Sequence, residues 1–251
     1  MRKFLLGAAG AFLLGLGTAT AAEGPALPSE HWSFEGVFGT FDRASAQRGF
    51  QVYQEVCSTC HGLYQLSYRD LAGIGFSPEE VRAIAAQKQV QDGPNDEGEM
   101  FQRPARPSDK FVKPFPNEQA ARAANNGAYP PDLSMLVKAR FHGPDYVYAI
   151  LTGYKDAPAD FKLGEGMNYN EFFPGHQIAM PKPLNDGAVT FADGTPNTVQ
   201  AMARDVTTFL SWASEPTLEE RHRTGVKVML FLIVAAVVFY FLKRRIWADV
   251  H

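Results

Sequence analysis

The longest apolar run of the chain lies near its C-terminus. Residues 228–242 contain no charged side chain, and Lys243, Arg244 and Arg245 follow directly. With its flanks, this run reaches the roughly 20 residues that a transmembrane helix needs. A buried core helix would not explain three consecutive basic residues directly after the apolar run. Because such clusters favour the cytoplasmic side, the pattern predicts a single transmembrane helix with flanks over residues 221–247 and a cytoplasmic tail over residues 248–251.

A shorter apolar run begins the chain. Arg2 and Lys3 precede apolar residues 4–16, and small residues follow at Ala21 and Ala22. This order predicts a cleaved signal peptide over residues 1–22, and the run is too short to serve comfortably as a membrane anchor. Both ends therefore place residues 23–220 outside the cytoplasm. The leader favours a protein of the bacterial inner membrane, with its large domain in the periplasm.

Between these two runs, helical periodicity alternates with irregular stretches. Apolar spacing and capping residues predict helices over residues 42–60, 77–90, 118–126, 131–140, 143–151 and 198–213. Residues 91–117 and 164–184 are predicted to be long connections, and Asp193 with Gly194 a hairpin turn. Trp32, Phe34, Phe38 and Phe41 make the N-terminal stretch too aromatic for a free tail, so it is expected to pack on the domain. No βαβ alternation is visible, and the fold class is predicted to be mainly α with long irregular insertions.

Charge and composition describe one exported, acidic domain. The 251 residues are 45% apolar, which is enough for one sizeable domain with appendages. The formal net charge is −3, but residues 23–220 hold 16 Lys and Arg against 26 Asp and Glu, a net charge of −10. Such a domain repels nucleic acids and attracts basic proteins. Its densest acidic stretch, residues 92–99, is expected to be a solvated loop.

The candidate chemistry lies at residues 57–61. Cys57 and Cys60 are separated by two residues and followed at once by His61, which is the pattern of covalent c-type haem attachment. They are the only cysteines of the chain. A thioredoxin-like redox pair would need a βαβ context, and half of a zinc site would need a second pair of ligands nearby. The motif therefore predicts one covalently bound haem c with His61 as an iron ligand.

The sixth iron ligand decides between electron transfer and reaction with small molecules. A methionine opposite histidine closes the iron and suits electron transfer. The methionines of the predicted outer domain are Met100, Met135, Met167, Met180 and Met202. Met135 and Met202 fall on predicted helices and are read as core residues, whereas Met180 lies in a loop stiffened by two prolines and is preferred. His142 or His176 could ligate instead, with a lower reduction potential.

Several spaced motifs carry a resemblance to a known family. They are the haem motif, the runs at residues 123–127, 130–134, 145–147, 151–154 and 193–195, the Met180 loop and the single C-terminal membrane helix. Together they resemble cytochrome c1, the membrane-anchored haem subunit of the ubiquinol:cytochrome c oxidoreductase, or cytochrome bc1 complex. The resemblance implies a cytochrome c fold with insertions and His61 and Met180 as axial ligands. It also implies that Arg140 and Tyr146 meet the haem propionates.

The same resemblance implies partners and a role. Electrons would arrive from a Rieske iron-sulfur protein and leave to a basic cytochrome c, soluble or tethered. Cytochrome b would lie beside the membrane helix of a dimeric complex. The apolar run contains no histidine, so quinol oxidation belongs to another subunit and the chain is not catalytic alone. Two alternatives are a membrane-anchored monohaem cytochrome c feeding a terminal oxidase and a haem-based gas sensor or peroxidase with an open iron.

Overall fold

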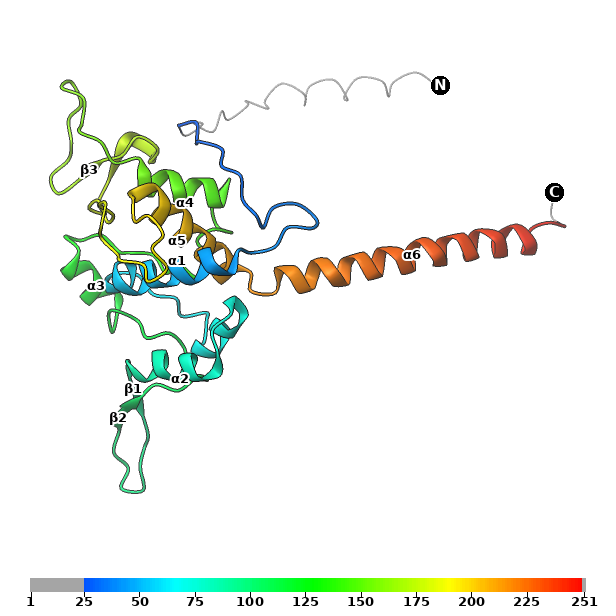
Figure 1. Ribbon diagram of the computed structural model, residues 1–251, viewed down its shortest axis with the longest axis horizontal. Helices are drawn as coiled ribbons and strands as arrows, with labels where there is room; N and C mark the ends of the chain where they lie inside the picture. Colours follow the sequence, from blue (N-terminus) through cyan, green and yellow to red (C-terminus); the bar gives the residue numbers. More distant parts are fainter. Residues whose placement is uncertain (1–24, 250–251) are drawn as a thin grey trace, which may run out of the picture.

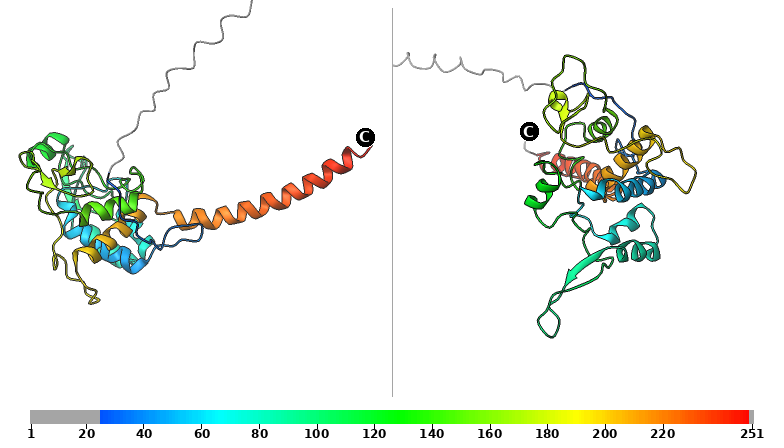
Figure 2. Two further views of the ribbon diagram at one scale, coloured as in Figure 1. Left: turned by 90° about the horizontal axis from the view of Figure 1, so that it is seen from above. Right: turned by 90° about the vertical axis from the view of Figure 1, so that its left-hand side faces the viewer.

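The computed structural model describes residues 25–249, so the predicted signal peptide lies outside the described residues. A packed domain is followed by one long helix that leaves it (Figures 1 and 2). The helices are α1 (Arg43–Glu55), α2 (Pro78–Ala86), α3 (Glu118–Ala124), α4 (Gly143–Thr152), α5 (Val199–Ser214) and α6 (Leu218–Ile246). Short 3-10 helices lie at Cys57–Thr59, Tyr68–Ile74 and Pro174–His176. The strands are β1 (Gln89–Asp92), β2 (Phe101–Pro104), β3 (Asn168–Tyr169) and β4 (Gln177–Ile178). The predicted mainly α fold is confirmed.

The core is built around the crossing of α1 and α5. At Gly49 of α1, an added Cβ would lie 2.0 Å from the backbone oxygen of Asp205 in α5, so only glycine lets the helices approach this closely. Beside the crossing, buried Asp205 accepts hydrogen bonds from Ser45 Oγ at 2.6 Å and from Arg48 Nε at 2.7 Å. The crossing therefore combines close backbone contact with a satisfied buried carboxylate.

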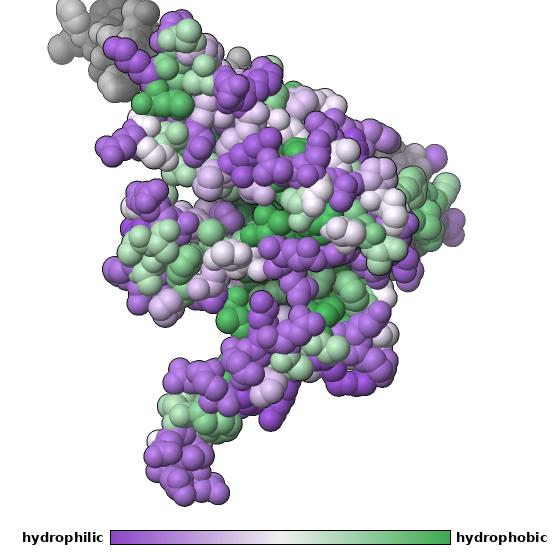
Figure 3. All heavy atoms as spheres, turned by 60° about the vertical axis from the view of Figure 1, so that its left-hand side comes forward, coloured by the Kyte–Doolittle hydropathy of each residue, from purple (hydrophilic) through white to green (hydrophobic). Residues whose placement is uncertain are grey.

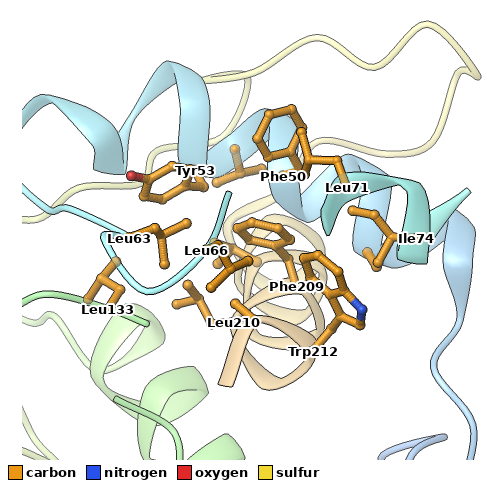
Figure 4. Packing of buried hydrophobic residues seen from close by; sticks show 14 of the residues in the cluster. Phe50, Tyr53, Leu63, Leu66, Leu71, Ile74, Leu133, Phe209, Leu210 and Trp212 are labelled. Carbon is orange, nitrogen blue, oxygen red and sulfur yellow. The ribbon is translucent and has the colours of Figure 1, made fainter. Parts of the chain in front are cut away.

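Aromatic and aliphatic side chains fill the space around this crossing. Phe209 of α5 is fully buried, and its ring centroid lies 5.5 Å from that of Phe50 on α1. Figure 4 shows how side chains from α1, α5 and the segments between them converge, namely Phe50, Tyr53, Leu63, Leu66, Leu71, Ile74, Leu133, Phe209, Leu210 and Trp212. Because α1 ends at the haem motif, this core also supports residues 57–61.

The helix starts predicted near residues 42, 77, 118 and 198 are confirmed by their caps. Asp42 accepts a hydrogen bond from Ser45 N at 3.1 Å, and Thr198 accepts one from Ala201 N at 3.2 Å. Ser77 and Glu80 form the predicted capping box at the start of α2. These side chains satisfy backbone N–H groups that have no partner within a helix.

The region after α2 differs from its prediction. The helix expected to reach residue 90 ends at Ala86, because residues 89–92 pair with residues 101–104 as an antiparallel hairpin. The hairpin projects from the domain (Figure 1). Arg103 bridges its base, with ion pairs to Asp92 and to Asp109. The long connection predicted over residues 91–117 thus contains a β-hairpin with the acidic residues at its tip.

Residues 131–140 also differ from prediction, since they form successive turns and no α-helix. Asp132 accepts hydrogen bonds from Ser134 N at 2.9 Å and from Tyr64 N at 3.0 Å. Leu133 N donates to Gly62 O at 2.9 Å. These bonds replace a helical ladder with contacts to the segment after the haem motif. Met135, expected in the core, is 46% exposed.

The N-terminal aromatic stretch packs on the domain as predicted, with one exception. Trp32, Phe34 and Phe41 are buried, and Trp32 Nε1 donates to Asp145 Oδ1 of α4 at 2.8 Å. Phe38 is instead 85% exposed.

The last helix, α6, contacts the domain at its first turn, where Glu219 pairs with Arg43, and then leaves it. It extends over 29 residues, none of them buried, and is the one described helix that is long and apolar enough to cross a membrane. Its apolar side chains point outward on every side, which is the pattern of a helix surrounded by lipid.

Candidate haem site

The haem motif folds as one tight turn at the end of α1. The helix ends at Glu55, and the backbone N–H groups of Cys60 and His61 both donate to Cys57 O, at 3.1 and 2.9 Å. The helix predicted to run through Cys60 is therefore wrong beyond Glu55. The turn still brings both thiols and the imidazole within one helical turn of each other. Both cysteines are free and partly exposed, so both sulfur atoms can form thioethers.

The imidazole ring of His61 is oriented by a contact with the backbone of Pro131. Its Nδ1 lies 2.7 Å from Pro131 O, and a carbonyl can only accept, so this contact assigns the proton to Nδ1. The Nε2 lone pair is then free for a metal. Burial lowers the pKa of His61, which favours the neutral ring that ligation requires. Tyr53 adds a second restraint by donating to the backbone oxygen of His61 at 3.0 Å.

The surroundings of Cys57 argue against a redox dithiol. Burial raises the pKa of the Cys57 thiol to about 12, and Cys60 adds to this effect. Reactive disulfide-exchanging cysteines have lowered pKa values because the thiolate is the nucleophile. Within residues 25–249, no group of three or more His, Cys, Asp or Glu side chains is placed to hold a metal ion.

The space next to the motif suits a prosthetic group. A pocket opens beside Cys60, and its lining combines rings such as Tyr64 and Tyr129 with the charged side chains of Lys113 and Glu118. Figure 3 shows apolar atoms in the hollows between polar ridges of the same domain. Free thiols, an imidazole with an open Nε2 and an adjacent pocket with both apolar rings and charged side chains together fit a covalently attached haem, which has an apolar ring and charged propionates.

Met180 lies in a loop whose backbone is held at Met180 itself. Tyr154 Oη donates to Met180 O at 3.0 Å, and Asn168 Nδ2 lies 3.4 Å from the same oxygen. Burial raises the pKa of Tyr154, so its phenol stays protonated and remains a donor. The β3–β4 pair closes the preceding segment, with Asn168 opposite Ile178. Met180 as an iron ligand stays a prediction. The sequence did not indicate that Tyr154 and Asn168 hold its backbone, although Tyr154 belongs to one of the quoted motifs.

The other methionine and histidine candidates for the sixth iron ligand differ in their exposure and contacts. Met202 is fully buried in the core, as predicted, whereas Met100 is 54% exposed next to the hairpin. Met167 is partly buried. His142 is exposed, in a left-handed conformation before α4. His176 Nδ1 lies 3.0 Å from Glu171 O, and its ring stacks on Tyr169.

Arg140 and Tyr146 lie together. The guanidinium carbon of Arg140 is 5.9 Å from the centroid of the Tyr146 ring. Arg140 is exposed, and its only side-chain hydrogen bond within the described residues goes to the neighbouring Ala139 O at 3.1 Å. Its remaining N–H groups can meet a carboxylate, and guanidinium is well suited to that pairing. Their contact with haem propionates stays a prediction.

Comparison with known proteins places the chain in a family. The model described as "Cytochrome C1 family" matches residues 32–250. Cytochrome c1 of Rhodospirillum rubrum is 45% identical, over 99% of this chain and 97% of that protein. Cytochrome c1-2, heme protein, mitochondrial, of Solanum tuberosum is 50% identical, over 97% and 95%. Cytochrome b/c1 of Bradyrhizobium diazoefficiens is 50% identical over 97% of this chain, but the chain spans only 39% of that longer protein.

Proposed function

The chain belongs to the cytochrome c1 family, and from this premise we propose that it binds one haem c covalently and transfers electrons within a cytochrome bc1 complex. The observation that carries the proposal is the turn at residues 57–61, with His61 Nδ1 at 2.7 Å from Pro131 O. Haem c, when bound between histidine and methionine, supplies one-electron chemistry at a closed iron. No atom of a substrate needs to be transferred.

The chain's own residues hold, orient and enclose the group. Cys57 and Cys60 would hold the haem through thioethers, and Pro131 orients the His61 ring so that its Nε2 would be available to the iron. The loop anchored by Tyr154 and Asn168 presents Met180 as the sixth ligand. Arg140 and Tyr146 hold the propionates. Restrained ligands limit the rearrangement that accompanies a change in iron charge, which suits electron transfer.

Haem attachment is tested on the purified full-length protein. We expect the optical spectrum of a low-spin c-type cytochrome and a haem that stays on the protein in acidified organic solvent. The Cys57→Ala and Cys60→Ala double variant is expected to lose covalent attachment, because both thioethers are removed. A colourless native protein, or a porphyrin that the solvent extracts from it, would contradict the proposal.

The methionine ligand is tested separately. Met180→Leu is expected to abolish the sulfur-to-iron charge-transfer band of the oxidised protein and to open the reduced iron to carbon monoxide. Met167→Leu, in the same irregular region, is the matched control and should retain the band. If the band survives in the Met180 variant, another residue ligates the iron, and rapid binding of carbon monoxide by the native protein would favour a sensor or peroxidase.

The proposed contact of Arg140 with the propionates has an electrochemical consequence. Removal of a cation beside the haem favours the more positive, ferric state, so Arg140→Gln is expected to lower the reduction potential. An exposed arginine of α2 gives the control, Arg82→Gln, which should leave the potential unchanged. Equal potentials in both variants would place Arg140 away from the haem.

We further propose the membrane arrangement and the partners. In this arrangement α6 is the single anchor in a bacterial inner membrane, residues 1–22 are removed, residues 23–220 are periplasmic, and residues 248–251 are cytoplasmic. The partners are cytochrome b, a Rieske iron-sulfur protein and a basic cytochrome c, in a dimeric complex. Support comes from the basic cluster after the apolar run and from the net charge of −10 over residues 23–220.

These proposals have two direct measurements. Protease added to spheroplasts should degrade the haem domain, whereas an intact domain under those conditions would reverse the orientation. Electron transfer to a basic cytochrome c should slow as ionic strength rises, because salt screens the attraction. Co-purification of cytochrome b and the Rieske protein separates this complex from a carrier that serves a terminal oxidase.

A further inference from the structure

A short apolar loop before α1 is exposed although both of its ends are buried. Residues 36–39 form a turn in which Gly39 N donates to Gly36 O at 3.2 Å, and Gly36 has a φ of 77°. At the tip, Val37 is 65% and Phe38 85% exposed. The flanking residues Phe34 and Phe41 are buried, with ring centroids 5.1 Å apart. The tip is thus held outward by a fixed base.

The base of this loop is attached to the beginning of α6. Phe41 N donates to Glu219 Oε1 at 2.9 Å, and Arg43 forms an ion pair with Glu219 at 2.9 Å. Figure 1 shows the loop on the side of the domain from which α6 leaves, and the left view of Figure 2 shows it beside the first turns of that helix. The exposed apolar tip is therefore next to the proposed membrane anchor.

The loop tip is long enough to reach the membrane interface beside the start of the apolar part of α6. The uncharged apolar run begins at Val228, nine residues after Glu219, or about 14 Å along the helix axis, and the headgroup region precedes it by about 5 to 7 Å. Phe38 is three residues before Phe41, a separation of at most about 10 Å and less than that in the turn of residues 36–39, to which the exposed side chain of Phe38 adds its own length. The side chain at the loop tip can therefore reach the level of the membrane interface.

The residues at the depth of the loop tip favour contact with lipid over contact with a protein partner. Arg221, His222, Arg223 and Lys227 lie on the first turns of α6, and basic residues at a membrane surface attract anionic headgroups. Phe and other apolar side chains bury themselves at the boundary between headgroups and acyl chains. Two side chains on a narrow loop are too small for a stable protein interface, which buries about 800 Å² on each partner.

We propose that Val37 and Phe38 insert into the outer-leaflet interface of the bilayer, giving the haem domain a second membrane contact beside α6. The inference rests on the proposed anchoring by α6. A single transmembrane helix can rotate and tilt in the bilayer together with the domain that it carries, whereas a second contact fixes which face of the domain points away from the membrane.

The test uses the full-length haem protein in its complex, reconstituted into vesicles of phosphatidylcholine and phosphatidylglycerol. Phe38→Cys and, separately, Val37→Cys are labelled with a nitroxide. Asp96→Cys at the tip of the exposed hairpin is the matched control. We expect oxygen, which concentrates in lipid, to relax the labels at positions 37 and 38 more than a water-soluble nickel chelate does, and the reverse at position 96.

Two results would overturn the inference. Labels at positions 37 and 38 that are as accessible to nickel as the label at position 96 would place the loop in water. Labels that neither reagent reaches would place it against a protein partner such as cytochrome b. A failure of the proposed haem binding can be told apart from a failure of this inference. Without haem, the protein would show no haem spectrum, and the free thiols of Cys57 and Cys60 would take up the label.

Discussion

The helices α5 and α6 are both rich in apolar residues, yet their surroundings are opposite. Of the 16 residues of α5, twelve are buried, including Asp205, Thr207 and Ser211. None of the 29 residues of α6 is buried. In α5 one side packs against α1, and several of its polar groups find partners within the domain, as when Ser211 Oγ donates to Thr207 O at 2.7 Å, although buried Thr207 Oγ1 and Trp212 Nε1 have no partner among the described residues. Apolar content is therefore compatible with either environment, and the arrangement of polar groups distinguishes them.

The largest expected effect contrasts two phenylalanines. Phe209→Ala in α5 removes a fully buried ring and should destabilise the domain by about 4 kcal/mol, through lost burial and the cavity that remains. Phe239→Ala in α6, where the ring is 66% exposed, should leave the unfolding of the domain unchanged. Urea unfolding of the detergent-solubilised protein, followed by haem absorbance, measures both variants. Equal losses would mean that α6 packs on the domain.

A charge in α6 tests its proposed lipid environment. Val234→Lys places a cation near the middle of the apolar run and should raise the free energy of membrane insertion by about 3 kcal/mol. Val226→Lys, near the end of the run, is the control and should cost less, because its side chain can extend to the interface. Alkaline extraction of membranes measures the inserted fraction of each variant. Equal insertion would place residue 234 outside the hydrocarbon core.

Two glycines give a third contrast. Gly49→Ala would place a Cβ 2.0 Å from Asp205 O, so α1 and α5 must separate, at a cost of about 2 to 3 kcal/mol. Gly225→Ala in α6 meets no atom within 4 Å in the described chain and, at a helical position, should be neutral or stabilising. Thermal unfolding of both variants is the measurement. A stable Gly49 variant would show that the crossing can open without loss.

The smallest contrast concerns two carboxylates that share Arg48. Asp205 is buried and accepts from Nε and Nη2 of Arg48 at 2.7 and 3.1 Å, so Asp205→Asn should cost about 2 kcal/mol. Asp193 meets the same guanidinium with a side chain that is 48% exposed, and Asp193→Asn should cost about 0.5 kcal/mol. Unfolding in urea separates the two, and high salt should reduce only the smaller contribution. A larger loss of stability in the Asp193 variant than in the Asp205 variant would mean that Asp193 is the more important partner of Arg48.

Local chemistry made much of the molecule predictable from sequence. The thiols and imidazole at residues 57–61, the apolar length of α6 and the caps Asp42, Ser77 and Thr198 are all encoded within a few neighbouring residues. Their consequences need no distant partner, since a capping side chain bonds its own helix and an apolar run of this length is long enough to span a membrane. The fold class and the motif-based resemblance to the family follow from the same local patterns.

Tertiary structure alone decided the features that depend on distant residues. The hairpin that ends α2 early needs strand pairing across the acidic turn, and the turns after Pro131 form because Asp132 bonds Tyr64, 68 residues away. The carbonyl that orients His61 comes from 70 residues along the chain. The exposure of Phe38 likewise depends on which of its neighbours are buried. Pairing over such separations is set by the packing of the whole chain, because no local propensity identifies the partner.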